Sequence, residues 1–265
     1  MLISTLEIFQ ALTIKQHPMA FCKFIRVCID LFEYIPITSK TLENGLEVIR
    51  KSFFVDENAC IAVNLQREPN AAIELEELCV RTALDGISVI AIDRKTGQVV
   101  GVSFNKLQVK SSDDFLFFKE FISKCKYPSS KALIQFMIDA DSVVDLFDLC
   151  QVNCLLEIMF IAVLKEYRGR GIAPKLFEMS MNIGKELLSG KNVKVSVTDD
   201  ALPLEPVPKA ACAILTSIYS QTLIKKLNLS IAADISYKKF TFEGESFANR
   251  IGSDTPSTQV VYKLF

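Results

Sequence analysis

The residues of this chain that point most directly to chemistry lie in a short glycine-rich run, Tyr-Arg-Gly-Arg-Gly-Ile-Ala, at residues 167–173. An apolar, strand-like segment at residues 155–164 precedes the run, and a helix-like segment at residues 174–188 follows it. Glycine lets a backbone come close to a ligand, and the first N–H groups of a helix have no partner inside the helix. Such a turn binds anions, and Arg168 and Arg170 add positive charge beside it. We therefore expect a pyrophosphate site in this turn.

Three patterns of phosphate loop compete for the run. A Walker loop requires Gly-x-x-x-x-Gly-Lys followed by Ser or Thr, and the sequence contains no such run. A dinucleotide-binding loop requires Gly-x-Gly-x-x-Gly at the start of repeating βαβ units, whereas this run lacks the last glycine and lies past the middle of the chain. The third pattern is Gln or Arg, then x-x-Gly-x, then Gly or Ala, and Arg168, Gly171 and Ala173 satisfy it. An ordinary glycine turn with solvated arginines is the alternative that needs no ligand.

The third pattern is that of the acetyl-CoA pyrophosphate loop of the GNAT N-acetyltransferases, and this segment resembles it. The resemblance implies that acetyl-CoA is the co-substrate and that its pyrophosphate lies on the loop residues Arg168, Gly169, Arg170, Gly171, Ile172 and Ala173. It also implies that pantetheine pairs with the strand before the loop, at Ile161, Ala162 and Val163, and that a nearby backbone N–H faces the thioester carbonyl.

A second motif, Ser-Phe-Phe-Val-Asp-Glu at residues 52–57, closes a predicted helix. It resembles the insect arylalkylamine N-acetyltransferases, in which an aromatic pair precedes Asp-Glu and the glutamate is the proposed general base. The resemblance gives this role to Glu57, although Asn58 and Ala59 replace the usual Pro-Leu. A carboxylate suits the chemistry because an ammonium ion must lose a proton before its nitrogen can attack. Without the resemblance, Asp56 and Glu57 are an acidic pair after a helix, and such pairs are usually solvated.

A third motif, Thr-Ser-Ile-Tyr-Ser at residues 216–220, lies at the start of another predicted helix. It resembles a Ser-x-x-Tyr-Ser run of the same insect enzymes, with Thr216 in place of the first serine. The resemblance implies that Tyr219 and Ser220 lie near the CoA sulfur, where a hydroxyl donates a proton or a hydrogen bond to the departing thiolate. The alternative is a helix with an exposed Ser-Tyr-Ser edge.

Composition narrows the classes of protein. The 265 residues carry a net charge of −1 and are 50% hydrophobic, so the chain lacks the basic signature of a nucleic-acid binder. No apolar run reaches the roughly 18 to 20 residues of a membrane span, and the start does not resemble a secretory signal. We therefore expect a cytoplasmic protein with no nucleic-acid or membrane partner, and favour a monomer.

The number of histidines and the spacing of the cysteines argue against several kinds of catalytic and metal site. The only histidine is His17, which leaves little material for Ser-His-Asp or Cys-His catalysis or for a histidine zinc site. The eight cysteines form no CxxC and match no zinc pattern, so we expect reduced, mostly buried thiols and no metal.

The order of elements predicts an α+β (α/β-like) fold, a mixed central sheet with helices on both faces, in the GNAT order. Residues 1–33 form an N-terminal extension, which we expect to be helical, and residues 34–265 form the acetyltransferase domain. The predicted strands and helices are strand 32–37, helix 42–53, helix 70–84, the hairpin 87–93 and 99–107, two helices within 115–149, strand 155–164, helix 174–188, strand 193–198, loop 202–208, helix 212–227, and strands 236–242 and 259–264.

The sequence thus predicts an N-acetyltransferase that transfers acetyl from acetyl-CoA to a small (arylalkyl)amine by direct attack in a ternary complex. Two alternatives stay open. A protein or peptide N-acetyltransferase on the same fold predicts an open acidic groove, and a non-catalytic acyl-CoA-binding protein predicts CoA binding without turnover.

Overall fold

The computed structural model describes residues 27–29, 31–112 and 115–265. The expected helical extension lies mostly outside these residues, as does His17. Within the described part, residues Val27–Ile29 form a strand, β1, rather than a helix, and β1 pairs with β2 at the edge of the sheet. No helix in the described part of the chain combines the length and the apolarity that crossing a membrane requires.

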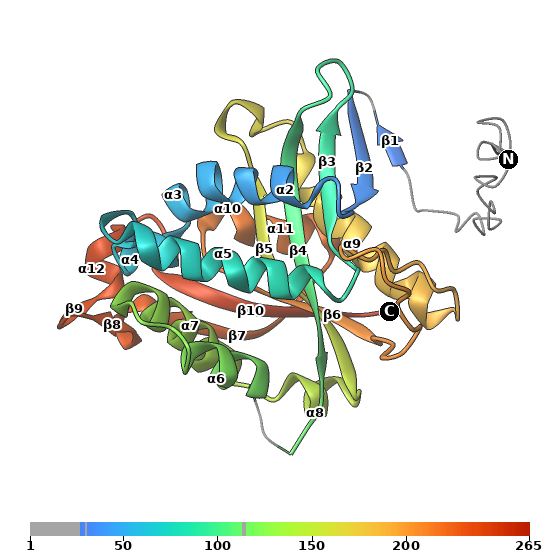
Figure 1. The fold of residues 1–265 in the computed structure, drawn as a ribbon. Coiled ribbons are helices and arrows are strands. Elements are labelled where there is room, and N and C mark those ends of the chain that lie inside the picture. The colour runs from blue at the N-terminus through green and yellow to red at the C-terminus, as the bar shows by residue number, and fades with distance from the viewer. Residues whose placement is uncertain (1–26, 30, 113–114) are drawn as a thin grey trace, which may run out of the picture.

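The centre of the molecule is an eight-stranded mixed sheet of order β1-β2-β3-β4-β5-β6-β10-β7, with helices on both faces (Figure 1). Neighbouring strands are antiparallel except β5 and β6, which are parallel. The remaining strands of the sheet are β2 (Phe32–Pro36), β3 (Val89–Asp93), β4 (Val99–Val109), β5 (Cys154–Val163), β6 (Ala210–Leu215), β7 (Ser230–Ser236) and β10 (Ser257–Leu264). A separate two-stranded hairpin consists of β8 (Thr241–Phe242) and β9 (Glu245–Ser246).

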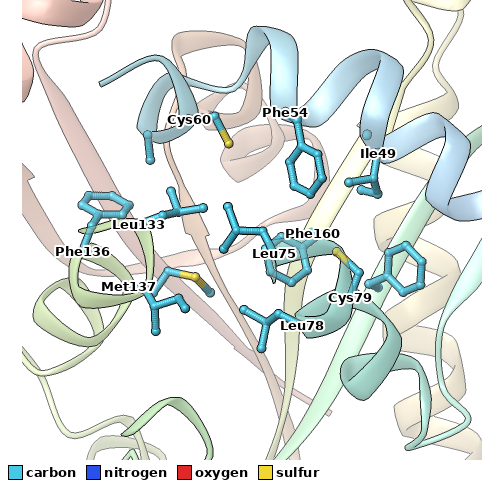
Figure 2. Close-up of a cluster of buried hydrophobic side chains, with 14 of the residues drawn as sticks. Ile49, Phe54, Cys60, Leu75, Leu78, Cys79, Leu133, Phe136, Met137 and Phe160 are labelled. Atoms are coloured by element: carbon cyan, nitrogen blue, oxygen red, sulfur yellow. The ribbon is translucent and has the colours of Figure 1, made fainter. Parts of the chain in front are cut away.

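One face of the sheet is covered by a continuous hydrophobic core, part of which Figure 2 shows. Phe160 of β5 belongs to this core together with side chains such as Phe54, Leu75 and Leu133. Full burial of such a side chain contributes about 1.5–3 kcal/mol, so this core fixes the helices that carry the Asp-Glu motif. The elements of this side are α2 (Leu42–Val48), the π-helical turn η1 (Ile49–Phe53), α3 (Phe54–Asp56), α4 (Asn58–Ala62), η2 (Leu65–Arg67), α5 (Pro69–Ala83), α6 (Leu116–Ile122), α7 (Pro128–Asp141), α8 (Leu146–Cys150), η4 (Tyr237–Lys239) and α12 (Phe247–Ile251).

The opposite face is covered by α9 (Ile172–Leu188) and α11 (Leu223–Leu227), with the short α10 (Ile218–Gln221) beside them. Strand β5 serves both cores because its side chains alternate: Leu156 and Ile158 point to the α9 side, and Leu155 and Phe160 to the other. The strand that precedes the glycine loop is therefore packed on both of its faces.

The main difference from the predicted elements concerns the strand beside β5. No strand forms at residues 193–198, and the parallel neighbour of β5 is β6, whose residues were expected to lie largely in a helix at 212–227. Strand β6 reads Ala-Ala-Cys-Ala-Ile-Leu, an apolar run with no alternation. A strand buried on both faces has no period-two signal, and alanine favours a helical interpretation. Three helices rather than two also occupy 115–149. The predicted strand at 236–242 is wrong, because β7 ends at Ser236 and is followed by the 3-10 turn η4 and the two-residue strand β8.

Candidate active site

The glycine loop has the backbone geometry of an anion site. Gly169 and Gly171 both have φ of +77°, a left-handed conformation that favours glycine, and α9 begins directly afterwards. Within the described chain, the backbone N–H groups of residues 169–173 donate to no backbone carbonyl. A Cβ added at either glycine would meet no atom within 4 Å, so the protein leaves open space beside the loop at both positions. Five N–H groups in succession before a helix are a site for phosphate. We call residues 169–173 the N–H nest.

Arg168 does not extend over this nest. Its Nε donates to the Val163 carbonyl at 3.1 Å, and its Nη2 donates to Ser52 Oγ and to Asp56 Oδ2, both at 2.7 Å. The ion pair with Asp56 is partly exposed and contributes at most about 1 kcal/mol. Arg168 therefore ties the glycine loop to the helical segment that carries Asp56 and Glu57, and a side-chain contact to pyrophosphate stays a prediction.

Arg170 lies on the other side of the loop. Its guanidinium stands 5.0 Å from the centre of the Tyr167 ring, and Tyr167 donates to Asp93 Oδ2 at 3.2 Å. Beside it, Arg170, Gly171 and Lys175 line a groove of about 540 Å³ that also takes in Lys226. Glu178 also lines this groove and pairs with Lys175 at 2.9 Å, so the cations of the groove that no carboxylate of the described residues is shown to engage are Arg170 and Lys226.

Strands β5 and β6 form a fork whose opening faces the nest. They pair only from Leu155 to Glu157, opposite Ala210 to Cys212, although both strands continue. A β-bulge at Met159 interrupts the ladder between β4 and β5 just beyond this point. The inner edges of both strands are therefore unpaired, and an unpaired strand edge binds an added extended chain.

The residues predicted to meet pantetheine divide between the two edges of β5. Leu164 donates its N–H to the Val100 carbonyl, toward β4. Because successive residues of a strand alternate, the backbone groups of Ala162 also face β4, whereas those of Ile161 and Val163 face the fork. The Val163 carbonyl already accepts from Ser52 and Arg168, so its N–H and the backbone of Ile161 are the groups open to a ligand.

Glu57 has a buried carboxylate oxygen with no partner. It caps α4, where its Oε2 accepts the Cys60 N–H at 2.8 Å. Its Oε1 is buried, and no hydrogen-bond donor of the described residues reaches it. The neighbouring Cys60 thiol is 1% exposed, and burial raises its pKa. A buried acceptor without a donor is costly, so Oε1 has an unused capacity to accept a hydrogen bond.

Two hydrogen bonds, from a residue before Glu57 and a residue after it in the sequence, connect its helical segment to the two strands of the fork. Six residues before Asn58, Ser52 Oγ donates to the carbonyl of Val163 at the end of β5, at 2.8 Å. Asn58 Nδ2 donates to the carbonyl of Thr216, directly after β6, at 2.7 Å. The helical segment from Ser52 to Asn58 therefore bridges the fork, and it carries Glu57 across the opening.

The two C-terminal candidates, Tyr219 and Ser220, lie on α10. Tyr219 is 83% exposed. Ser220 forms a capping box with Ser217: each side chain accepts the other's backbone N–H at 3.1 Å. The Ser220 hydroxyl also donates to the Ser217 carbonyl at 2.9 Å. The structure thus gives Ser220 a role as a helix cap, and the proposed roles of both hydroxyls at the CoA sulfur stay predictions.

Three residues of the site were not singled out from the sequence as functional: Ser52, Asn58 and Tyr237. Ser52 and Asn58 flank the Asp-Glu pair, so their position was a usable signal. Tyr237 follows β7 and carried none. Its hydroxyl donates to the Thr216 carbonyl at 2.6 Å, and its pKa is raised, by burial above all and also by the charge of Glu57.

No protein-family model matches the chain, and no curated protein sequence matches it. Solved structures do match. Arylalkylamine N-acetyltransferase 2 from Aedes aegypti is 22% identical, with a TM-score of 0.68 over 89% of this chain and 99% of that one. An agmatine N-acetyltransferase is 15% identical, with a TM-score of 0.70 over 89% and 100% of the two chains. A Drosophila melanogaster polyamine N-acetyltransferase that forms N-acetylagmatine is 14% identical, with a TM-score of 0.66 over 88% and 100%. The chain therefore has the GNAT acetyltransferase fold, as the glycine loop predicted.

Proposed function

We propose that this protein is an N-acetyltransferase that transfers the acetyl group of acetyl-CoA to small amines. The observation that carries the proposal is the buried, unpartnered Oε1 of Glu57, held across the open fork between β5 and β6. A fold that merely bound CoA would have no use for a desolvated acceptor at this point.

The residues present fit acetyl-CoA as a substrate. The N–H nest at residues 169–173 suits a pyrophosphate, and Arg170 supplies positive charge beside it. The free edge of β5 suits the amide groups of pantetheine, which would pair with Ile161 as an added strand does. These two sites in sequence lead the thioester toward Glu57.

The chemistry that follows is direct transfer. Glu57 takes a proton from the bound ammonium ion, and the amine nitrogen then attacks the thioester carbonyl carbon. The new C–N bond forms as the C–S bond breaks, and the electron pair leaves with sulfur. The nitrogen releases its second proton to give the amide, and the thiolate takes up one proton to give the CoA thiol. General-base assistance of this kind contributes about 10² to 10⁴-fold, and backbone N–H groups on the fork edge would stabilise the charge on the thioester oxygen.

We propose arylalkylamines as the preferred substrates, with agmatine and polyamines as the runner-up class. Aromatic side chains stand near the motif: Phe53 packs edge-on against Phe160, with ring centres 5.3 Å apart. Asp56, the neighbouring carboxylate, is engaged by Arg168 and is not available for a second ammonium group. The names of the similar structures support both classes. We further propose a cytoplasmic monomer; the cysteines Cys60, Cys79, Cys125, Cys150, Cys154 and Cys212 are free and buried.

The test is a panel of amines with acetyl-CoA, in which CoA thiol release is followed and the products are identified by mass. We expect N-acetylated arylalkylamines to form faster than acetylated agmatine or spermidine. CoA binding without release of thiol from any amine or peptide would instead indicate a non-catalytic acyl-CoA-binding protein. Turnover confined to peptides would indicate a protein N-acetyltransferase.

A further inference from the structure

We propose that Tyr237 and Asn58 are positioning residues that hold the fork open and set Glu57 across it. The expected effect on catalysis rests on the proposed function. The structural role of the two residues rests on the hydrogen bonds to one carbonyl group. That carbonyl belongs to Thr216, the first residue after β6.

The Thr216 carbonyl accepts two strong hydrogen bonds. Tyr237 Oη donates at 2.6 Å and Asn58 Nδ2 donates at 2.7 Å. Thr258 of β10 donates to the carbonyl of Leu215, the last residue of β6, at 3.3 Å. The end of β6 is therefore held by donors on three different elements, none of them β5.

Tyr237 is a rigid point of attachment. It is 0% exposed, and its ring is stacked on Phe136 at 21° with the centres 6.3 Å apart. Phe240 meets the same ring edge-on at 6.4 Å, and Phe247 completes the cluster through Phe136. Aromatic side chains packed in this way have little freedom to move, so the hydroxyl presents a fixed donor.

These bonds oppose the natural tendency of the fork to close. Unpaired edges of adjacent strands pair when they meet, and β5 and β6 already share a short parallel ladder from which pairing would extend. Ser52 and Arg168 hold the end of β5 at its Val163 carbonyl, and Tyr237 and Asn58 hold the end of β6. Asn58 follows Glu57 directly in the chain, so the same bond that holds β6 also places the carboxylate.

Because the two donors share one acceptor, the test compares the single variants with the double variant. The variants are Tyr237→Phe, Asn58→Ala and the double variant, with Tyr127→Phe, in the connection between α6 and α7, as the matched control. Two quantities are measured for each: kcat/KM for the best amine, and the ratio of the affinities for CoA and for 3′-phospho-ADP. This probe carries the pyrophosphate and the 3′-phosphate of CoA but lacks pantetheine, so the ratio reports on the fork.

We expect each single variant to lose about 3- to 10-fold in kcat/KM, because the remaining donor still satisfies the carbonyl. The double variant should fall about tenfold or more below the product of the two singles, and its affinity ratio should fall about tenfold with the affinity for 3′-phospho-ADP unchanged. Tyr127→Phe should match the wild type in both quantities. A double variant equal to the product of the singles, or an unchanged ratio, overturns the proposal.

Two further arms keep the outcome decisive. Asn58→Asp replaces the donor by an acceptor of the same size, so at pH 8 its affinity ratio should fall further than that of Asn58→Ala. This single substitution decides the proposal if the double variant does not fold. If the wild type acetylates no amine, the proposed function fails, and the affinity ratio by itself still confirms or refutes the hold on the fork.

Discussion

Gly171→Ala separates the anion site from ordinary backbone strain. Gly171 has φ of +77°, and Gly97, in the turn between β3 and β4, has φ of +74°. At both positions an added Cβ would meet no atom within 4 Å. The two substitutions therefore impose the same conformational strain and no steric clash within the protein, but only Gly171 belongs to the N–H nest.

The magnitudes follow from this pairing. A non-glycine residue in the left-handed region costs about 1–2 kcal/mol, from which the lower entropy of the unfolded alanine chain subtracts about 0.4–1 kcal/mol. The net loss of about 1 kcal/mol predicts a melting temperature lower by about 2–4 °C in both variants. In Gly171→Ala the methyl group also stands where a phosphate would approach. Loss of two hydrogen bonds to a charged group, about 1.5 kcal/mol each, weakens CoA binding about 100-fold.

The assay is calorimetric titration with CoA, alongside thermal unfolding, for the wild type, Gly171→Ala and Gly97→Ala. Gly97→Ala should bind CoA as the wild type does while melting at the lowered temperature. The reasoning is refuted if Gly171→Ala retains wild-type affinity for CoA, or if Gly97→Ala loses affinity to the same extent.

Two further predictions concern charged side chains. Arg168→Ala should reduce turnover about tenfold or more, while CoA affinity, measured by titration, should change less than that. The reason is that Arg168 donates to Val163, Ser52 and Asp56 and not to a group on the nest. An equal loss of turnover and of CoA affinity would instead indicate that the guanidinium binds the phosphate. Burial raises the pKa of Glu157 on β5 from 4.5 to about 7. Between these two pH values the folded protein holds a proton that the unfolded chain releases. The contribution of Glu157 to stability is therefore highest below pH 4.5 and is lost as the pH rises to about 7. Glu157→Gln should raise the melting temperature at pH 8 and reduce its fall across that window. The neighbouring Asp141, whose pKa burial also raises, still contributes to the remaining fall. A variant that melts in parallel with the wild type at every pH would contradict this.

The glycine loop and the acidic motif could be recognised in the sequence because each consists of contiguous residues. A strand, two glycines and a helix start are contiguous, so the backbone geometry of Gly169 and Gly171 follows from residue types alone. The proposed role of Glu57 came from the resemblance of its motif to the insect enzymes, because an acidic pair after a helix is by itself usually solvated. That its Oε1 is buried and unpartnered depends on packing between distant elements, and no local pattern encodes it.

The misplaced and missed parts are those that depend on tertiary pairing. Strand β6 is buried on both faces, which removes the alternation that would distinguish it from a helix. The side chain of Arg168 could extend either toward the nest or toward Asp56, and only the approach of the η1–α3 segment to the end of β5 decides between them. Tyr237 lies 180 residues after Glu57 in the sequence, counted from 57 to 237, and only the fold brings it to the site.

Glu57→Gln tests the central claim most directly. The variant keeps the size of the side chain and removes its basicity, and Glu77→Gln, on the exposed side of α5 where Glu77 pairs with Arg81, is the matched control. Initial rates of acetyl transfer to the best amine are measured at saturating acetyl-CoA, with CoA affinity determined in parallel. We predict that Glu57→Gln lowers kcat by about 10² to 10⁴-fold with CoA affinity unchanged, and that Glu77→Gln behaves as the wild type. Turnover of Glu57→Gln at the wild-type rate would contradict the assignment of Glu57 as the base.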